Sequence, residues 1–388
     1  MIDLRLGFKI YDNDWFLKYG LGPVEAADVL ASMGATFVIA QSRFLPMQDS
    51  AVESQVRTAD GRYQGLDDVA FRNALRERNI AYFGCLNICF DPAFAAAHPE
   101  LLSIDQFGKK EEKQDWYIGL PPDREENLEH KIAILERAVP ALDPDGIHLG
   151  FVRWPGFWEL WLPGVERAKM PEYCYSPQTL GRFCEVADVD LPLGDATASA
   201  RMISERYRRE WRDWKCGVTV RAIGQIRRAV QKLRPDTAIA INTLPFFQSD
   251  FDNAVEEVFG QDIVRLSDVV DVFEVMSYHQ ILGRDAAWPA EIGNDIKRRT
   301  SRRAVCTLQA KALYLDGMHA GRGRHSEISA EEFACAVDGL EGSSVDGMCL
   351  FTFSQILEAR ETELGRRAMK RLAGFRRTSQ TRRGQDSA

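Results

Sequence analysis

The chain has 388 residues and a formal net charge of −8, with 49 basic and 57 acidic side chains. The two signs are interspersed and form no basic stripe, which argues against a nucleic-acid partner. No apolar run approaches the roughly 20 residues that cross a membrane, and a predicted strand begins almost directly after Met1. We therefore expect a cytoplasmic protein without a secretion signal or a membrane partner.

Eight short apolar segments recur along the chain, and helical patterns lie between most of them. The segments span residues 4–11, 37–42, 80–89, 146–154, 238–246, 272–279, 304–311 and 347–354. The helical patterns span residues 23–33, 67–78, 124–138, 202–233, 290–298 and 330–340. Nearly continuous apolar runs are typical of parallel strands buried on both faces. Eight such units predict an α/β fold, a closed (β/α)8 barrel.

The spacing of the segments predicts two long insertions, after the third and fourth strands. These are residues 90–124 and 155–200, and we expect them to fold over the C-terminal ends of the strands, where barrel enzymes hold their sites. Residues 1–376 then form a single domain. Residues 377–388 contain no apolar content to bury and are predicted to be a disordered tail.

Eight cysteines are scattered along the chain, and four of them lie within predicted strands. A buried thiol behaves as a small hydrophobic side chain. The spacing of Cys85 and Cys89 is a weak metal signal, and we favour the core interpretation. The sequence predicts no metal site and no cofactor.

Alternation along each strand predicts which side chains point into the barrel. They are Lys9, Tyr11, Gln41, Arg43, Asn87, His148, Gly150, Val152, Trp154, Asn242, Glu274, Met276, Tyr278, Thr307, Gln309, Lys311, Thr352 and Ser354. A lumen packed for stability would be mostly aliphatic, so these polar groups favour a polar ligand such as a saccharide. The alternative is that they satisfy one another.

Candidate acids lie on one strand and in several loops. Glu274 is the strand-borne inward carboxylate, and either catalysis or an ion pair with a lysine would explain it. Asp12 follows the first strand, while Asp91 and Asp123 are better explained as helix caps. Glu159 lies in the segment Trp154-Pro-Gly-Phe-Trp-Glu-Leu-Trp, whose aromatic rings could stack on sugar rings.

Several segments carry a family resemblance. Asp145-Gly-Ile-His-Leu-Gly-Phe-Val-Arg-Trp-Pro-Gly resembles the fourth strand of a group of glycoside-hydrolase-like barrels, which has a pattern close to Asp-Gly-Ile-His-Leu-Asp-Phe-Ile-Arg-Tyr-Pro. Residues 98–108, 211–220 and 271–279 resemble other segments of this group, and Met276-Ser-Tyr278 is distantly similar to chitinase-type barrels. Two departures matter: Gly150 replaces the usual aspartate, and Gln309 stands where many retaining barrel glycosidases have a glutamate.

The resemblance implies an enzyme that cleaves a small or modified saccharide by carboxylate acid/base chemistry. We expect Glu274 to be catalytic, with Glu159 or Asp12 as its partner. The expected substrate-binding residues are Arg43, Asn87, His148, Arg153, Trp154, Trp158, Asn242, Tyr278, His279 and Gln309. The two arginines favour an anionic sugar, because a guanidinium pairs well with a carboxylate or sulfate.

Two alternatives stay open at this point. A lyase or isomerase could use Lys9 or Lys311 as a Schiff-base nucleophile in the lumen. A degenerate barrel could bind a saccharide without cleaving it, as the missing aspartate at Gly150 suggests. The expected partner in each hydrolase or binding hypothesis is a small saccharide, and a homo-oligomer is left open.

Overall fold

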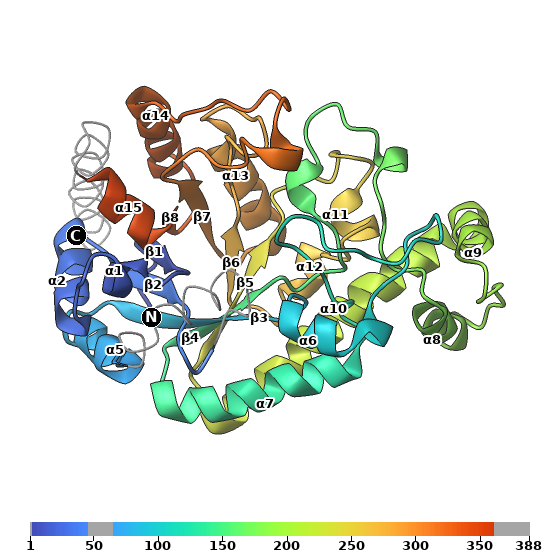
Figure 1. The fold of residues 1–388 in the computed structure, drawn as a ribbon, viewed down its shortest axis with the longest axis horizontal. Coiled ribbons are helices and arrows are strands. Elements are labelled where there is room, and N and C mark those ends of the chain that lie inside the picture. Colours follow the sequence, from blue (N-terminus) through green and yellow to red (C-terminus); the bar gives the residue numbers. More distant parts are fainter. Residues whose placement is uncertain (1, 46–64, 361–388) are drawn as a thin grey trace.

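Eight parallel strands close into a barrel in chain order, which confirms the predicted (β/α)8 fold (Figure 1). The computed structural model describes residues 2–45 and 65–360. The strands are β1 Leu6–Ile10, β2 Phe37–Ala40, β3 Ala81–Asn87, β4 Gly146–Gly150, β5 Ala238–Thr243, β6 Val272–Val275, β7 Arg303–Gln309 and β8 Gly347–Phe351. The predicted tail and the C-terminal end of the predicted domain lie outside the described residues.

Helices surround the barrel, and each predicted helical pattern corresponds to one. The α-helices of the described residues are α1 Asp14–Leu17, α2 Pro23–Met33, α5 Asp68–Glu77, α6 Pro92–Ala97, α7 Glu125–Leu142, α8 Pro177–Ala187, α9 Ala196–Met202, α10 Arg208–Leu233, α11 Ala254–Glu257, α12 Ile263–Leu266, α13 Trp288–Thr300, α14 Ala330–Glu341 and α15 Phe353–Ala359. The pattern 202–233 is not one uniform helix, because a π-helical turn, η4 Ile203–Tyr207, precedes α10.

Side-chain caps fix the starts of several helices. Asp91 accepts a hydrogen bond from the backbone N–H of Phe94 at 2.9 Å and caps α6, as predicted. The predicted cap at Asp123 is wrong: α7 begins one residue later, and Asp123 instead pairs with the guanidinium of Arg124 at 2.8 Å. Ser329 and Glu332 form a capping box at the start of α14.

The strands are shorter at their C-terminal ends than the apolar segments suggested. β4 ends at Gly150 because Phe151 adopts a positive φ of 55°, which the extended ladder cannot accommodate. β6 ends at Val275, whose carbonyl accepts a hydrogen bond from the N–H of Ser277 at 2.8 Å in a turn. The alternation rule therefore stops applying before Trp154 is reached.

Two apolar layers hold the barrel together. Side chains including Phe37, Phe83, Val272 and Val305 form a cluster in the lumen, while the alternate residues of the same strands pack against the helices. Gly7 and Gly146 leave room for the rings of Phe37 and Phe83, since a Cβ atom at either position would overlap them. This packed lumen supports the polar residues at the C-terminal ends.

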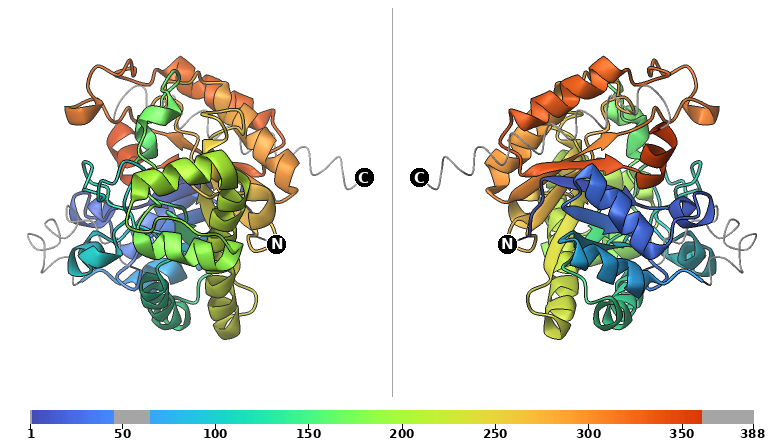
Figure 2. Two further views of the ribbon diagram at one scale, coloured as in Figure 1. Left: turned by 90° about the vertical axis from the view of Figure 1, so that its right-hand side faces the viewer. Right: turned by 90° about the vertical axis from the view of Figure 1, so that its left-hand side faces the viewer.

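The insertion after β4 builds a separate lobe. Helices α8 and α9 lie at one end of the molecule, joined to the barrel through the start of α10 (Figure 1), and face the viewer on the left of Figure 2. The lobe has its own apolar cluster, which includes Trp154, Phe183, Trp211 and Trp214. Within residues 2–45 and 65–360, no helix is both long and apolar enough to cross a membrane.

Candidate active site

A cavity of about 400 Å³ opens at the C-terminal ends of the strands, where barrel enzymes place their sites. It is lined by Lys9, Tyr11, Phe90, Trp116, Phe151, Trp158, Glu159, Asn242, Met276, Tyr278, Ile281, Leu313, Tyr314, Phe351 and Gln355. Strand ends supply the floor, and the insertions after β3 and β4 supply part of the wall. The predicted position of the insertions is confirmed for these residues.

Aromatic rings make up much of this mouth cavity. Phe90 stacks on Phe151 with ring centroids 4.9 Å apart, and Trp158 lies 6.1 Å from the ring of Tyr278. Across the mouth, Nε1 of Trp116 donates a hydrogen bond to the hydroxyl of Tyr314 at 3.0 Å. Aromatic walls with a few polar groups suit the apolar C–H faces and hydroxyl edges of a sugar ring.

Glu159 is the carboxyl group of the mouth cavity. Its side chain is only 4% exposed, and its Oε2 atom has no hydrogen-bond partner among the described residues. Burial raises its pKa to about 7, although Arg153 and Arg324 lower it in part. A carboxyl group with this pKa is partly protonated at neutral pH, as a general acid must be.

Arg153 lies close enough to influence Glu159 but forms no ion pair with it. Its side chain is 1% exposed, and none of its three guanidinium nitrogens has a hydrogen-bond partner within the part of the chain that the structure describes. The guanidinium carbon lies 4.8 Å from the ring centroid of Phe151 and 5.8 Å from that of Tyr117. A buried cation without an anionic partner is costly, so aromatic contacts alone leave it poorly compensated.

Glu274 lies beneath the mouth cavity and has the opposite environment. It is fully buried and accepts hydrogen bonds from Nζ of Lys9 at 2.9 Å and from the hydroxyl of Thr307, and its Oε2 lies 3.2 Å from Nε2 of His148. Burial alone would raise its pKa, but these partners together lower it to about 2. Glu274 therefore lacks the raised pKa expected of a general acid and does not line the mouth cavity.

The two lysines of the Schiff-base alternative differ in position. Nζ of Lys9 also contacts the hydroxyl of Tyr278 at 3.1 Å, and the charge of Glu274 raises the pKa of Lys9 despite its burial. Lys9 is thus held protonated, which disfavours nucleophilic attack. Lys311 is not a lumen residue, because its side chain is 56% exposed and pairs with Glu358.

The structure brings together only some of the predicted site residues. Trp158, Glu159, Asn242 and Tyr278 line the mouth cavity, and His148 lies beneath it against Glu274. The Oδ1 atom of Asn242 accepts a hydrogen bond from the N–H of Phe151 at 3.1 Å, which orients the amide. Burial lowers the pKa of His148, but Cys85 and Glu274 outweigh it and raise the pKa overall.

Other predicted site residues have structural partners away from the mouth cavity. Asp12 is bound by the hydroxyls of Ser354 and Thr352, and Arg43 pairs with Asp68 at 3.0 Å. These two residues do not line the mouth cavity.

Three further predicted site residues contact other parts of the protein, and their roles stay predictions. Trp154 packs against Trp214 in the lobe, and Nε2 of His279 lies 3.0 Å from Glu332 of α14, because both residues lie beyond a strand end. The amide of Gln309, the last residue of β7, accepts a hydrogen bond from the N–H of Ile281 at 3.2 Å and donates one to the Oε1 atom of Gln280 at 3.1 Å. None of the three lines the mouth cavity.

The side chain of Asn87 lies against the backbone of Gly150, so the residue types at these two positions depend on each other. They are paired neighbours on β3 and β4, and a Cβ atom built on Gly150 would overlap the Oδ1 atom of Asn87. The Asn87 amide thus occupies the space that a side chain at position 150 would enter, the position at which the sequence pattern that this segment resembles has an aspartate. Asn87 itself is buried and does not line the mouth cavity.

The sequence analysis missed most of the aromatic wall. Phe90, Phe151 and Phe351 lie at strand ends, where an apolar residue is easily assigned to the core. Trp116 and Tyr314 come from loops and meet across 198 residues of sequence. A clustering of aromatic residues just after strand ends could have identified the first three, but no local signal pairs the last two.

Comparisons with known proteins support the architecture. No protein-family model and no curated protein matches the chain. Among solved structures, the glycoside hydrolase domain of PgaB (BpsB) from Bordetella bronchiseptica is similar at a TM-score of 0.64 and 15% identity, covering 94% of this chain and 98% of that one. The β-galactosidase from the psychrophilic Marinomonas ef1 gives 0.62 and 11%, covering 97% and 60%.

A third similar structure is α-L-fucosidase isoenzyme 2 from Paenibacillus thiaminolyticus, with a TM-score of 0.58 and 12% identity, covering 98% of this chain and 49% of that one. This chain thus spans about half to three fifths of the length of the galactosidase and the fucosidase. At these identities the likeness concerns the fold. The fold of this chain is a (β/α)8 barrel similar to the folds of these three solved structures.

Proposed function

We propose that the protein is a glycoside hydrolase in which Glu159 is the general acid. The observation that carries the proposal is the environment of Glu159: a buried carboxyl group with one unpaired oxygen and a pKa of about 7, in an aromatic cavity at the C-terminal end of the barrel. Such a group can protonate a leaving glycosidic oxygen at neutral pH. The similar solved structures, which include a β-galactosidase and an α-L-fucosidase, support the same class of reaction.

The substrate in this proposal is a small or modified saccharide. The cavity volume of about 400 Å³ suits one or two sugar units, and its aromatic walls offer stacking faces. Arg153 has no anionic partner among the described residues and gives the region positive charge, which favours a sugar with an anionic substituent, whereas the charge of Lys9 is already paired with Glu274. Arg43 does not contribute, since Asp68 already pairs with it.

Glycoside hydrolysis ordinarily needs a second group that attacks the sugar or activates water. Glu159 is the single carboxylate among the described residues that line the mouth cavity. In this proposal the attacking group is an acetamido oxygen of the substrate, or a water near Tyr278 and Asn242 whose proton passes to the Glu159 carboxylate after Glu159 has protonated the leaving group. Substrates with and without an N-acetyl group separate these two routes.

The experiment compares wild type, Glu159→Gln and Glu166→Gln on aryl glycosides of galactose, fucose, N-acetylglucosamine and glucuronic acid. Glu166 is the matched control, because it lies in the same insertion but is 67% exposed and pairs with Lys169. On any cleaved substrate we expect Glu159→Gln to lower kcat/KM by about 10²- to 10⁴-fold, while Glu166→Gln leaves it unchanged. Full activity of a folded Glu159→Gln variant would exclude the proposed role.

A second candidate function is saccharide binding without cleavage. It is favoured by one observation, namely that Glu274 is locked to Lys9 and leaves Glu159 without a carboxylate partner in the described wall. Calorimetry with the free sugars of the same panel distinguishes the two functions. Binding without turnover of any aryl glycoside would support this second function and contradict the first.

A further inference from the structure

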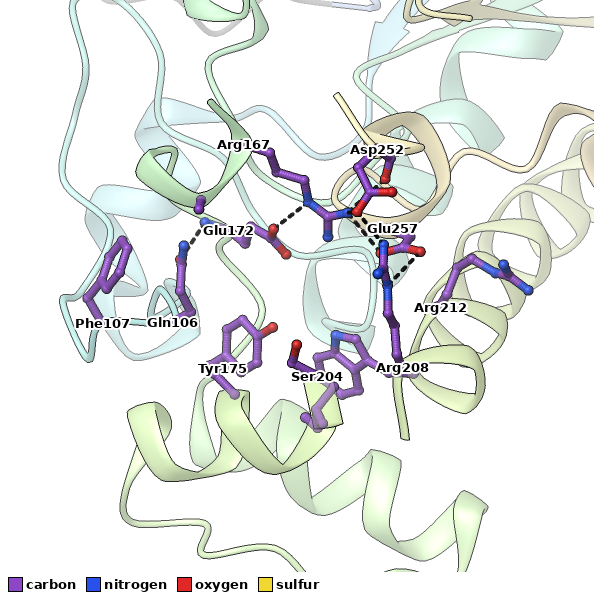
Figure 3. Close-up of a pocket in the computed structure, with 14 residues that line it drawn as sticks. Gln106, Phe107, Arg167, Glu172, Tyr175, Ser204, Arg208, Arg212, Asp252 and Glu257 are labelled. Carbon is purple, nitrogen blue, oxygen red and sulfur yellow. Dashed lines mark hydrogen bonds and ion pairs between the residues drawn. The ribbon is translucent and has the colours of Figure 1, made fainter. Parts of the chain in front are cut away.

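A second cavity, of about 350 Å³, lies between the lobe and the barrel (Figure 3). Three parts of the chain build it: the insertion after β3, the insertion after β4 with the start of α10, and the segment around α11 after β5. These three connections follow β3, β4 and β5, and residues at or just after the ends of these strands line the mouth cavity. The two cavities share no described lining residue.

Ion pairs form one wall of this lobe cavity. Arg167 pairs with Glu172 at 2.9 Å and with Glu257 at 2.8 Å, and Arg208 pairs with Glu257 at 2.8 Å and with Asp252 at 2.6 Å (Figure 3). The charged side chains that line the cavity are three arginines and three acids, so their formal charges cancel. A charged ligand would have to break these pairs. The wall instead offers hydrogen-bonding edges to an uncharged ligand.

Aromatic and hydroxyl groups form the rest of the lobe cavity. Tyr175 and Trp211 stack with ring centroids 5.6 Å apart, and Phe107 is 53% exposed. The hydroxyl groups of Tyr175 and Ser204 point into the space between these side chains and the arginines (Figure 3). Ser204 lies in the π-helical turn η4, a local irregularity that is frequent at functional sites.

We propose that the lobe cavity is a second saccharide-binding site, which holds uncharged sugar units remote from the bond in the mouth cavity. Planar polar side chains, hydroxyls and an exposed aromatic ring together match the hydroxyl edges and C–H faces of a sugar. The ion pairs alone would fasten the lobe to the barrel, but fastening does not require the exposed ring of Phe107 or the exposed hydroxyl of Ser204 in the cavity wall. The inference rests on the proposed function, because it assumes a saccharide substrate.

The test measures binding of oligosaccharides to the full chain by saturation-transfer NMR and calorimetry. The probes are galactose and N-acetylglucosamine oligosaccharides of four to six units, each compared with its monosaccharide. Ser204→Trp would fill the lobe cavity, and Phe107→Ala would remove its exposed ring. Val186→Ala is the matched control, since Val186 lies on α8, is 69% exposed and does not line the lobe cavity.

We expect Ser204→Trp to abolish binding at the lobe and Phe107→Ala to weaken it by about 2- to 10-fold. Val186→Ala and Glu159→Gln should bind as wild type does at this site. Thermal unfolding of each variant checks that the lobe is intact. Unchanged oligosaccharide affinity in folded Ser204→Trp, or no binding of any probe by wild type, would overturn the inference.

The outcome separates this inference from the proposed function. If Glu159→Gln abolishes hydrolysis and Ser204→Trp does not change oligosaccharide binding, the lobe site is excluded and the hydrolase proposal stands. If Ser204→Trp abolishes oligosaccharide binding but the wild type cleaves no glycoside, the lobe site stands and the hydrolase proposal is excluded.

Discussion

Glu159 and Glu274 are two buried carboxyl groups at the same end of one barrel, yet their pKa values move in opposite directions. Both are almost excluded from solvent, at 4% and 0% exposure, and burial raises the pKa of each. Glu274 has Lys9 at 2.9 Å and accepts further hydrogen bonds, whereas the Oε2 atom of Glu159 has no partner among the described residues. The contact partners, and not the depth of burial, decide which carboxyl keeps its proton.

The different environments of Glu159 and Glu274 suit the two carboxyl groups to different roles. An ionised carboxylate locked to a lysine holds strands β1 and β6 together across the lumen. A partly protonated carboxyl in a cavity is suited to proton transfer. The substitutions below change Glu274, the surroundings of Glu159 or one of the two lysines.

The largest expected effect on stability comes from Glu274→Gln. The substitution leaves Lys9 buried without its anion, and we expect the free energy of unfolding to fall by about 3–5 kcal/mol. Urea denaturation measures it, with Glu77→Gln as the control because Glu77 is 75% exposed. The double variant with Lys9→Met should lose less than the single one. A loss below about 1 kcal/mol in Glu274→Gln would show that the pair is not structural.

The pH dependence of unfolding checks the same pair independently. The pKa of Glu274 in the folded protein is about 2, below its ordinary value of 4.5. Its contribution to stability is therefore complete above about pH 4.5 and is lost as the pH falls toward 2. The difference in unfolding free energy between wild type and Glu274→Gln should shrink over this window.

A smaller effect is expected from Arg153→Met, which tests what tunes Glu159. The positive charge of Arg153 lowers the pKa of Glu159 in part, so its removal should raise that pKa above about 7. Since the acid must be protonated, activity falls as the pH rises through this pKa. The alkaline limb of kcat/KM should therefore move to higher pH. Arg43→Met, which removes an arginine paired with Asp68, should leave the limb in place.

The smallest effect is expected from Lys311→Ala, which sharpens the contrast between the two lysines. Lys311 is 56% exposed, and its partner among the described acidic residues is Glu358, at a long distance of 3.4 Å. The free energy of unfolding should change by less than about 0.5 kcal/mol, and turnover should not change. Trapping of a carbonyl compound on Lys311 by borohydride would contradict this expectation and revive the Schiff-base alternative.

The fold could be predicted because buried parallel strands leave a strong mark on the sequence. Alternation within strands also predicted that Lys9, His148, Glu274 and Thr307 point into the lumen, where Glu274 contacts the other three. The rule failed where the backbone leaves the pleat, so Trp154, which alternation placed in the lumen, packs against Trp214 in the lobe.

The wall of the site could not be predicted in the same way. Trp116 and Tyr314 meet only because two loops far apart in sequence converge over the barrel. The raised pKa of Glu159 likewise depends on burial and on an Oε2 atom that no described donor contacts. The local sequence cannot predict that absence, because it depends on the packing of distant segments. For this wall, an indication came from the aromatic segment around Glu159, whose rings were expected to contact a sugar.

The contact between Asn87 and Gly150 has a consequence for redesign. A carboxylate introduced at position 150, at the end of the fourth strand, would displace the Asn87 amide, because the Oδ1 atom of Asn87 lies where the new Cβ would be. The cost of replacing either residue should therefore depend on the residue at the other position. A design that adds an acid at position 150 should accordingly vary position 87 at the same time.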